Sequence, residues 1–503
     1  MAISFSTIPP NLRVPLFWAE FDASQASYLS LPQPACLIGY KLSNAPAPLL
    51  EPTLVSSVDL AAALFGAGSM LTDMVASYRL QDPVGQLWCV AVAEPEGAPA
   101  TGTITFVGAP IGSSTLAVYI GDTRYPLAVS TTSTPATLAT ALAAAITADP
   151  FATVTAAAAT GAVTLTSRHA GIGGNALNLA VNLRGLIAGE LVPAGLTVTV
   201  TPFADGTGDP DIAPALAALA DADYDFVGIP WSSPTVLDAC QQAFDHQTGR
   251  WAWNIQLYGH VFTARSDTLN ALATFGRTRN DPHLSILGYP AGSPTPPWRM
   301  AAAATGVAAV GLRADPARPL QTLPLVGTAL APRGHRFSVG ERQSLLFSGI
   351  GTCSAGPDEI VRVERMATTY QRNVWGLADP SWLDVQTPAT LQLIVRETRN
   401  RILAKFPRMK LADDGTRLGA GQAVVTPSTI RAELVALYSE LEEVGLAENM
   451  AAFKEHLIVE RDANDPNRIN VLFPPDLVNQ LRIFAMLVQF RLQYPSAAVA
   501  AAA

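Results

Sequence analysis

The chain has 503 residues, of which 49% are hydrophobic and 15% are charged, and its formal net charge is -9. This length corresponds to about three domains of roughly 100–200 residues each. The apolar content is sufficient for substantial cores, which excludes a disordered chain. The negative charge provides no global basic field, so a nucleic-acid-binding protein is not expected.

The first 20 residues are predicted to form an extended arm. They contain Pro9, Pro10 and Pro15 and alternate apolar with polar residues, which does not fit a helix. They lack a basic region followed by a long apolar region, so we expect no signal peptide and a chain that is kept in the cytoplasm or released by lysis. The apolar stretch at 483–488 is too short to span a bilayer.

Two stretches, residues 21–96 and 210–385, are predicted to form one discontinuous α/β domain. The apolar runs at 35–42 and 87–93 are typical of strands buried on both faces. Further strand-like segments alternate with helix-like segments, which indicates a mainly parallel sheet covered by helices. These predicted strands are 224–229, 252–258 and 283–287, and the predicted helices are 211–220, 234–246 and 264–275.

Residues 97–209 are predicted to be a β-rich domain inserted into the α/β domain. The segment is dominated by Ala, Thr, Gly and Val, has no Trp or Cys, and is bounded by turn-rich sequences. Pro135–Ala148 is predicted to be a helix with Thr134 as its N-cap. The strand-like segments are 102–107, 115–120, 124–129, 163–166 and 196–201.

Residues 386–503 are predicted to form a small α+β domain that ends in a C-terminal arm. Thr387 is expected to cap a helix over 388–406, and Thr426 a helix over 427–444 that stops at Gly445. The predicted strands are 457–461, 470–473 and 483–492.

Patterns that would support catalysis, cofactor binding or metal binding are weak. No nucleophile elbow and no phosphate-binding loop are present, so we expect neither an active site nor a cofactor. Gly66 and Gly68 supply two glycines of a dinucleotide fingerprint without the third, and we interpret them as a break between helices. The four cysteines are far apart in the sequence, which favours buried, reduced thiols.

Two charged clusters allow more than one interpretation. Asp221, Asp223 and Asp225 could bind a divalent cation, although a solvated turn is favoured. A basic cluster lies on the predicted helix 388–406 and just beyond it, with Glu397 as its single acid. This cluster could be a solvated face or a docking face for an acidic partner. Its members are Arg396, Arg399, Arg401, Lys405, Arg408 and Lys410.

The order of these parts resembles that of the tail sheath proteins of Mu-like contractile-tailed bacteriophages. The similarity includes the opening segment 2–17, the run 223–227, the loop 167–171 and the segment 465–471, so it spans nearly the whole chain. The resemblance implies a structural subunit that polymerises around a tail tube and contracts to drive the tube through the host envelope. It also implies a non-catalytic core domain with a subtilisin-like fold.

The resemblance further implies that terminal arms join neighbouring subunits by adding strands to a C-terminal domain. The expected partners are many copies of this chain, the tail tube protein, and baseplate and tail terminator proteins, with no nucleic acid and no direct membrane insertion. The expected location is the virion tail, with host cytoplasm during assembly. The basic cluster is expected to contact the tube, and the β-rich domain to project outward. The residues expected to link subunits are Ile8, Val14, Leu16, Phe17, Ile483, Phe484, Leu487 and Phe490.

Two other functions remain open at the level of sequence. An α/β serine hydrolase would need a serine and a base within hydrogen-bond reach. A carbohydrate-binding adhesin is suggested by the β-rich segment, which lacks the Trp and Tyr cluster expected of a glycan site.

Overall fold

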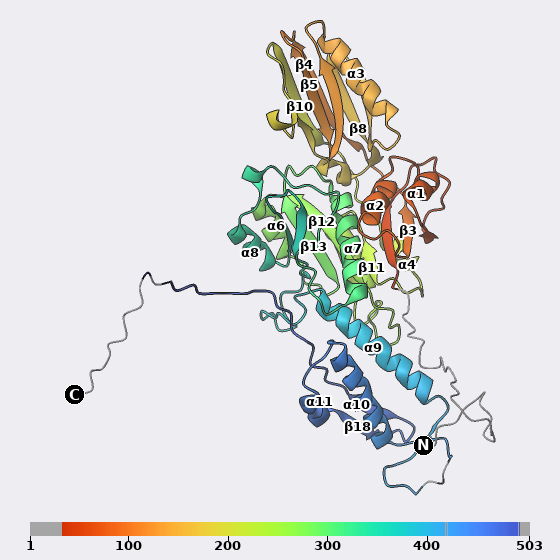
Figure 1. Ribbon diagram of the computed structural model, residues 1–503. Helices are drawn as coiled ribbons and strands as arrows, with labels where there is room; N and C mark the ends of the chain where they lie inside the picture. Colours follow the sequence, from red (N-terminus) through yellow and green to blue (C-terminus); the bar gives the residue numbers. More distant parts are fainter. Residues whose placement is uncertain (1–32, 418, 420, 491, 493–503) are drawn as a thin grey trace, which may run out of the picture.

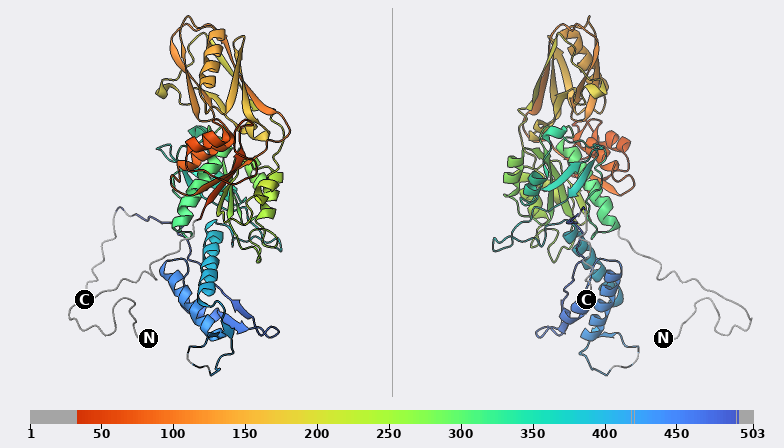
Figure 2. Two further views of the ribbon diagram at one scale, coloured as in Figure 1. Left: turned by 90° about the vertical axis from the view of Figure 1, so that its right-hand side faces the viewer. Right: turned by 60° about the vertical axis from the view of Figure 1, so that its left-hand side comes forward.

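The computed structural model describes residues 33–417, 419, 421–490 and 492, arranged in three parts that follow one another along the molecule (Figure 1). An α/β part lies in the middle, with a β-rich part at one end and a smaller, mostly helical part at the other (Figure 2). The predicted N-terminal arm lies outside the described residues. Within the described residues, the helices are too short or too polar to cross a membrane.

The middle part is built on an eight-stranded sheet in the order β15-β14-β13-β12-β11-β1-β3-β2. Strands β1 and β3 pair in parallel, as do β1 with β11, β11 with β12, β12 with β13 and β13 with β14. The two outermost strands, β2 and β15, are antiparallel to their neighbours. The bounds are β1 (Ala35–Tyr40), β2 (Thr53–Leu54), β3 (Leu87–Val92), β11 (Phe226–Gly228), β12 (His260–Asp267), β13 (Leu284–Pro290), β14 (Gly351–Ala355) and β15 (Val361–Arg365).

The central parallel strands follow a doubly wound order. Numbered along the chain, β1, β3, β11, β12 and β13 are arranged 2-1-3-4-5 in the sheet, and the winding reverses between β1 and β11. A mixed α/β architecture with several sheets is therefore confirmed. The more specific subtilisin-like label stays a prediction.

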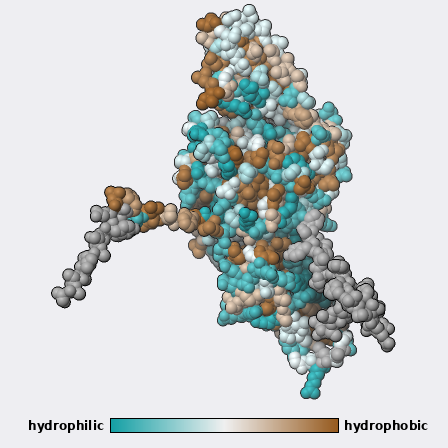
Figure 3. Space-filling model, viewed as in Figure 1, coloured by the Kyte–Doolittle hydropathy of each residue, from teal (hydrophilic) through white to brown (hydrophobic). Residues whose placement is uncertain are grey.

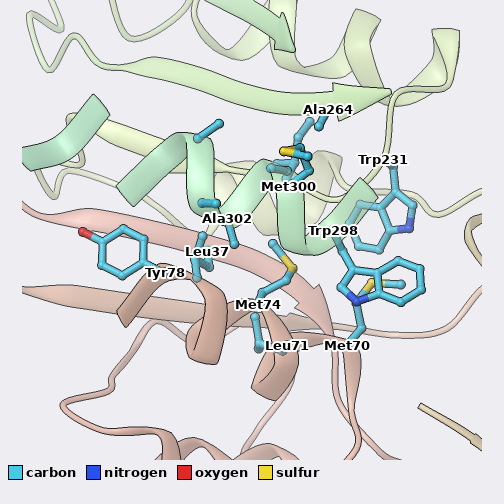
Figure 4. Packing of buried hydrophobic residues seen from close by; sticks show 14 of the residues in the cluster. Leu37, Met70, Leu71, Met74, Tyr78, Trp231, Ala264, Trp298, Met300 and Ala302 are labelled. Atoms are coloured by element: carbon cyan, nitrogen blue, oxygen red, sulfur yellow. The ribbon is translucent and has the colours of Figure 1, made fainter. Parts of the chain in front are cut away.

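Close packing of α2 (Met70–Arg79) and α7 (Pro297–Ala314) covers one face of this sheet. Alanines on α7 allow a close approach, and Leu37, Met74 and Met300 fill the space between sheet and helices (Figure 4). The remaining helices of this part are α1 (Val58–Phe65), α4 (Ala213–Ala217), α5 (Pro234–Ala243), α6 (Leu269–Gly276), α8 (Val339–Leu346) and the 3₁₀ turn η3 (Arg333–His335).

The β-rich part contains two sheets and one helix. The predicted helix is confirmed as α3 (Pro135–Ala148), and Thr134 closes a capping box with Thr137. The four-stranded sheet has the order β10-β4-β8-β7, and the three-stranded sheet has the order β6-β5-β9. The bounds are β4 (Pro99–Gly108), β5 (Ser114–Ile120), β6 (Thr123–Val129), β7 (Val154–Ala159), β8 (Ala162–Ala170), β9 (Leu179–Val181) and β10 (Leu196–Ala204), with 3₁₀ turns η1 (Ile172–Ala176) and η2 (Leu186–Ala188).

The C-terminal part has its own small core around Tyr438 of α10, whose ring stacks on Phe453 of α11 with centroids 3.7 Å apart. Thr426 caps α10 as predicted. The bounds are α9 (Gln386–Lys405), β16 (Lys410–Leu411), β17 (Val424–Val425), α10 (Pro427–Glu443), α11 (Met450–His456), β18 (Ile458–Arg461) and β19 (Ile469–Leu472).

Some predicted elements of the α/β part and the start of α9 differ from the structure. The strand predicted at 252–258 is wrong, because that segment forms turns with positive φ at Gln256 and Tyr258, and the strand begins at His260. The helix predicted at 264–275 consequently begins later, at Leu269. Helix α9 begins at Gln386, so Thr387 lies inside the helix and does not cap it.

Candidate functional site

A C-terminal segment, residues 481–490, leaves the body of the subunit, and we call it the C-terminal arm (Figures 1 and 3). At its start, Gln321 Nε2 donates to the Leu481 carbonyl at 3.2 Å, and Arg482 lies 3.1 Å from Asp384 and 3.0 Å from Gln386. The predicted strand at 483–492 is wrong for the single subunit, because its described residues pair with no strand.

The arm exposes large apolar side chains that a single subunit does not cover. Such a concentration of exposed apolar surface marks a site of interaction. Figure 3 shows it as a continuous hydrophobic stretch. The exposed fractions are 80% for Ile483, 81% for Phe484, 93% for Leu487 and 78% for Phe490. The other predicted linkage residues, Ile8, Val14, Leu16 and Phe17, lie outside the described residues.

The hairpin of β18 and β19 is a candidate acceptor for an added strand. It is a separate two-stranded antiparallel sheet, so within the described residues each strand has one unpaired edge. It also exposes Ile458, Val471 and Leu472. A two-stranded hairpin is only marginally stable by itself, and a further strand would stabilise it.

Arg396 is held inside the subunit and does not lie on a docking face. Its guanidinium is 2.6 Å from Asp225 Oδ1 and 3.2 Å from Asp223 Oδ1, and its exposed fraction is 8%. The prediction that Arg396 contacts a tube is therefore contradicted. The sequence did not reveal this burial, because the carboxylate that pairs with Arg396, that of Asp225, is distant along the chain.

Asp225 is a buried ion-pair partner, so the favoured interpretation of its aspartate run as a solvated turn is wrong at this position. Its exposed fraction is 3%, and Gln392 of α9 also donates to it. Burial raises the pKa of Asp225, and the charge of Arg396 opposes that effect. No group of three or more metal-ligating side chains occurs within the described residues.

The other basic residues of the cluster divide into two groups. Arg401 and Lys405 lie 3.1 Å and 2.7 Å from Glu433 on α10, and Arg401 also pairs with Glu440, so these charges join two helices of the same subunit. Within the described residues, the exposed side chains of the second group form no ion pair. This group comprises Arg399, Arg408 and Lys410.

A serine and a histidine do lie within hydrogen-bond reach in the α/β part. His260 Nε2 is 2.9 Å from Ser285 Oγ, yet Ser285 is fully buried and His260 is 5% exposed. Burial lowers the pKa of His260 to about 3, so the imidazole stays neutral at physiological pH. Among the described residues, His260 Nδ1 contacts no carboxylate that could orient it as a base.

The crevice at the reversal point of the sheet, where doubly wound folds bind ligands, is filled by the chain itself. His169 of β8 accepts a hydrogen bond from the Met70 N–H at 2.9 Å, and its Nδ1 donates to Glu94 at 2.6 Å. The cavity that remains beside Tyr40 and Trp298 has a volume of about 10 Å³, which suits at most one water molecule. Residues of the β-rich part thus lie in this crevice.

Two further expectations are confirmed. The four cysteines are free and buried. The glycines at 66 and 68 lie between α1 and α2, as expected of a break between helices.

Comparisons with known proteins agree with one another. The model described as "phage tail sheath protein central domain" matches residues 205–369, and "phage tail sheath C-terminal domain" matches residues 378–491. The Mu-like prophage FluMu tail sheath protein of Haemophilus influenzae is 38% identical over 496 residues, which cover 97% of this chain and 100% of that protein.

Two solved structures are similar at low identity. The sheath tail protein of Desulfitobacterium hafniense matches with 13% identity and a TM-score of 0.48, over 92% of this chain and 97% of that chain. The sheath tail protein of Listeria innocua matches with 12% identity and a TM-score of 0.47, over 89% and 92%.

Proposed function

Since this chain belongs to the phage tail sheath family and is a structural subunit of a contractile tail sheath, we propose that its copies are linked by strand addition. The C-terminal arm of one subunit adds a strand to the β18–β19 hairpin of a neighbour. The observation that carries this proposal is the row of exposed apolar side chains on an extended segment that leaves its own subunit.

The energetics favour such a joint. Each added backbone hydrogen bond contributes about 0.5–1.5 kcal/mol, and each large apolar side chain that becomes buried contributes about 1.5–3 kcal/mol. The arm carries apolar residues on both of its faces, as a strand covered on both sides requires. Several such contacts per subunit give a joint that persists while the rest of the subunit moves.

The N-terminal arm, residues 1–20, is the proposed second component of the same joint. We also propose that the chain divides into three domains: a discontinuous α/β domain of residues 21–96 and 210–385, an inserted β-rich domain of residues 97–209, and a C-terminal domain of residues 386–503. In this scheme the arms stay paired while the α/β and β-rich parts rotate together during contraction. The contacts of His169 with Met70 and Glu94 support this joint movement.

The proposed partners are the proteins of the tail tube and of the two ends of the sheath. Arg399, Arg408 and Lys410 are proposed to contact an acidic surface of the tail tube protein, and baseplate and terminator proteins are proposed to bind the ends of the sheath. The sheath is a component of the virion tail, and its assembly in host cytoplasm is a proposal. The β-rich part is proposed to face outward, because it lies at the opposite end of the subunit from these basic residues (Figure 1).

The proposed role is non-enzymatic and needs no cofactor. The burial of Ser285 and His260 supports it, since a substrate would have to reach a fully buried hydroxyl group. Neither a serine hydrolase nor an adhesin is favoured by the family.

A truncation after Arg482 tests the linkage. It keeps the contacts of Arg482 and Gln321, so the subunit should remain folded by circular dichroism, whereas tubes should disappear in negative-stain microscopy. A second truncation that removes residues 1–20 tests the N-terminal arm in the same way. Normal tubes from the C-terminally truncated protein would exclude the proposed joint.

A further inference from the structure

A short hairpin at residues 371–379 has a fixed shape. Arg372 and Ala378 form a β-bridge, and the Asn373 N–H donates to the Leu377 carbonyl at 2.9 Å. The side-chain oxygen of Asn373 accepts hydrogen bonds from the N–H groups of Trp375 and Leu377, each at 3.1 Å. The turn is therefore closed by side-chain and backbone bonds together.

The base of this hairpin is hydrogen-bonded to the end of α6 and to Asn280 in the loop that follows it. Asn280 Oδ1 accepts from the N–H groups of Gln371 and Arg372 at 2.7 and 2.9 Å, and Asn280 Nδ2 donates to the Arg372 carbonyl at 2.9 Å. Gln371 Nε2 donates to the Gly276 carbonyl at 3.0 Å. The hairpin is thus preorganised before it meets any partner.

The tip of this rigid hairpin is apolar and exposed. The exposed fractions are 90% for Val374, 80% for Trp375 and 65% for Leu377. A rigid apolar tip loses little conformational entropy when it docks, and tryptophan is among the residues enriched at the energetic centre of interfaces. These properties fit an insertion element.

A groove of about 520 Å³ lies elsewhere on the same subunit, between α4, α5 and the loop that precedes β12. Small apolar residues, among them Ala217 of α4 and Ala239 of α5, leave space there, and Ile255 forms part of the wall. Trp375 and its neighbours do not line this groove, so the hairpin and the groove are different surfaces. The volume is in the range of pockets that enclose a bulky side chain with its neighbours.

We propose that the 371–379 hairpin of one subunit inserts Trp375 into the α4–α5 groove of a second copy of this chain. A contact between two different surfaces of identical subunits is heterologous and continues from copy to copy into a helical assembly, as a sheath requires. Charge supports the same partner: Arg372 is exposed at the base of the hairpin, Asp221 is exposed in the groove, and neither forms an ion pair within the described residues. This inference rests on the sheath function.

Disulfide cross-linking tests the contact in assembled sheath. The double variant Val374→Cys/Ala217→Cys keeps Trp375 and should give a ladder of covalently joined subunits on a non-reducing gel after mild oxidation. The control Val374→Cys/Ala136→Cys places the second thiol on an equally exposed helical alanine outside the groove, and it should give no ladder. The native cysteines are buried and should not interfere. Tubes without a ladder, or equal ladders from both variants, would refute the contact.

Assembly provides a second readout. Trp375→Ser and, separately, Ala217→Glu should each raise the concentration needed for assembly at least tenfold, with unchanged thermal unfolding of the monomer. Ile187→Ser, which removes another highly exposed apolar side chain, in the β-rich part, should have no such effect. If Trp375→Ser polymerised normally but lost binding to tail tube protein, the partner would be the tube. Normal tubes from the wild type would still uphold the sheath function in either case.

Discussion

The guanidinium of Arg396 on α9 lies 2.6 Å from Asp225 at the start of β11, across a sequence separation of 171 residues. This buried ion pair, reinforced by Gln392, fixes the first helix of the C-terminal part against the α/β part. The ion pair therefore helps to position the C-terminal part, including the β18–β19 hairpin, relative to the α/β part.

Replacing Asp225 should destabilise this junction strongly. Asp225→Ala removes the buried carboxylate that pairs with Arg396 and leaves it only the longer contact with the more exposed Asp223. Breaking a buried ion pair in this way costs about 3–5 kcal/mol. The free energy of unfolding, measured by urea denaturation, should fall by this amount. Asp221→Ala is the matched control, because Asp221 is exposed and its loss should change stability by less than about 0.5 kcal/mol. Equal effects of the two changes would show that the ion pair does not stabilise the junction.

Replacing His169 should loosen the β-rich part. His169→Ala leaves the Met70 N–H without its acceptor and removes one of the two hydrogen bonds of the Glu94 carboxylate, which still accepts from the Ala170 N–H. The unpaired buried N–H costs about 1–3 kcal/mol. Hydrogen exchange should increase in the two connections at 94–99 and 205–210. His335→Ala changes an exposed histidine and should leave the exchange unaltered. An unchanged exchange rate in the His169 variant would contradict the proposed coupling of the two parts.

Stability should depend on pH through Asp122, which contacts Arg299 at the boundary between the β-rich and α/β parts. Burial raises the pKa of Asp122 from 3.8 to about 6. Between these two values the folded state binds more protons than the unfolded state, so the contribution of this group to stability increases as the pH falls.

Asp122→Asn should remove that dependence, which amounts to about 2–3 kcal/mol over this pH range. The measurement is the difference in unfolding free energy between pH 7.5 and pH 4.5 for variant and wild type. Burial also raises the pKa of Asp281 to about 6, but Asp281 titrates in both proteins and cancels in the difference. Identical pH profiles of the two proteins would contradict the assignment to Asp122.

Charges placed on the C-terminal arm should block assembly without affecting the monomer. Phe484→Asp and Leu487→Asp alter side chains that the single subunit leaves exposed, so its melting temperature should not change. In the assembled state each charge would be buried without a partner, so tubes should be absent in negative-stain microscopy. Val84→Asp, at a site that is 92% exposed in the α/β part, is the control and should assemble normally.

The basic cluster should separate into two functional groups. Arg401→Ala should lower stability because it removes contacts with Glu433 and Glu440. The triple change of Arg399, Arg408 and Lys410 to Ala should preserve the melting temperature and weaken binding to tail tube protein, most visibly at low salt. Co-sedimentation with tubes measures the second effect. Unaltered tube binding by the triple variant would remove these residues from the proposed contact.

Local signals in the sequence determined several elements correctly. Thr134 and Pro135 set the start of α3, Thr426 and Pro427 set the start of α10, and the apolar runs at 35–42 and 87–93 identified strands buried on both faces. The order of parts along the chain was sufficient to suggest the family. Caps, turns and runs of apolar residues act within a few positions, so one sequence carries their information.

Only the tertiary structure decided which charged and polar side chains are buried and paired within the subunit. The sequence favoured a solvated turn for Asp225 and allowed a solvated face or a docking face for Arg396, whereas the fold buries the two side chains against each other. No sequence pattern indicated that His169 would accept a hydrogen bond from the Met70 N–H. The segment predicted as a strand at 252–258 forms turns at Gln256 and Tyr258, and the strand begins only at His260. Partners so distant along the chain are chosen by packing and burial, which local sequence patterns do not encode.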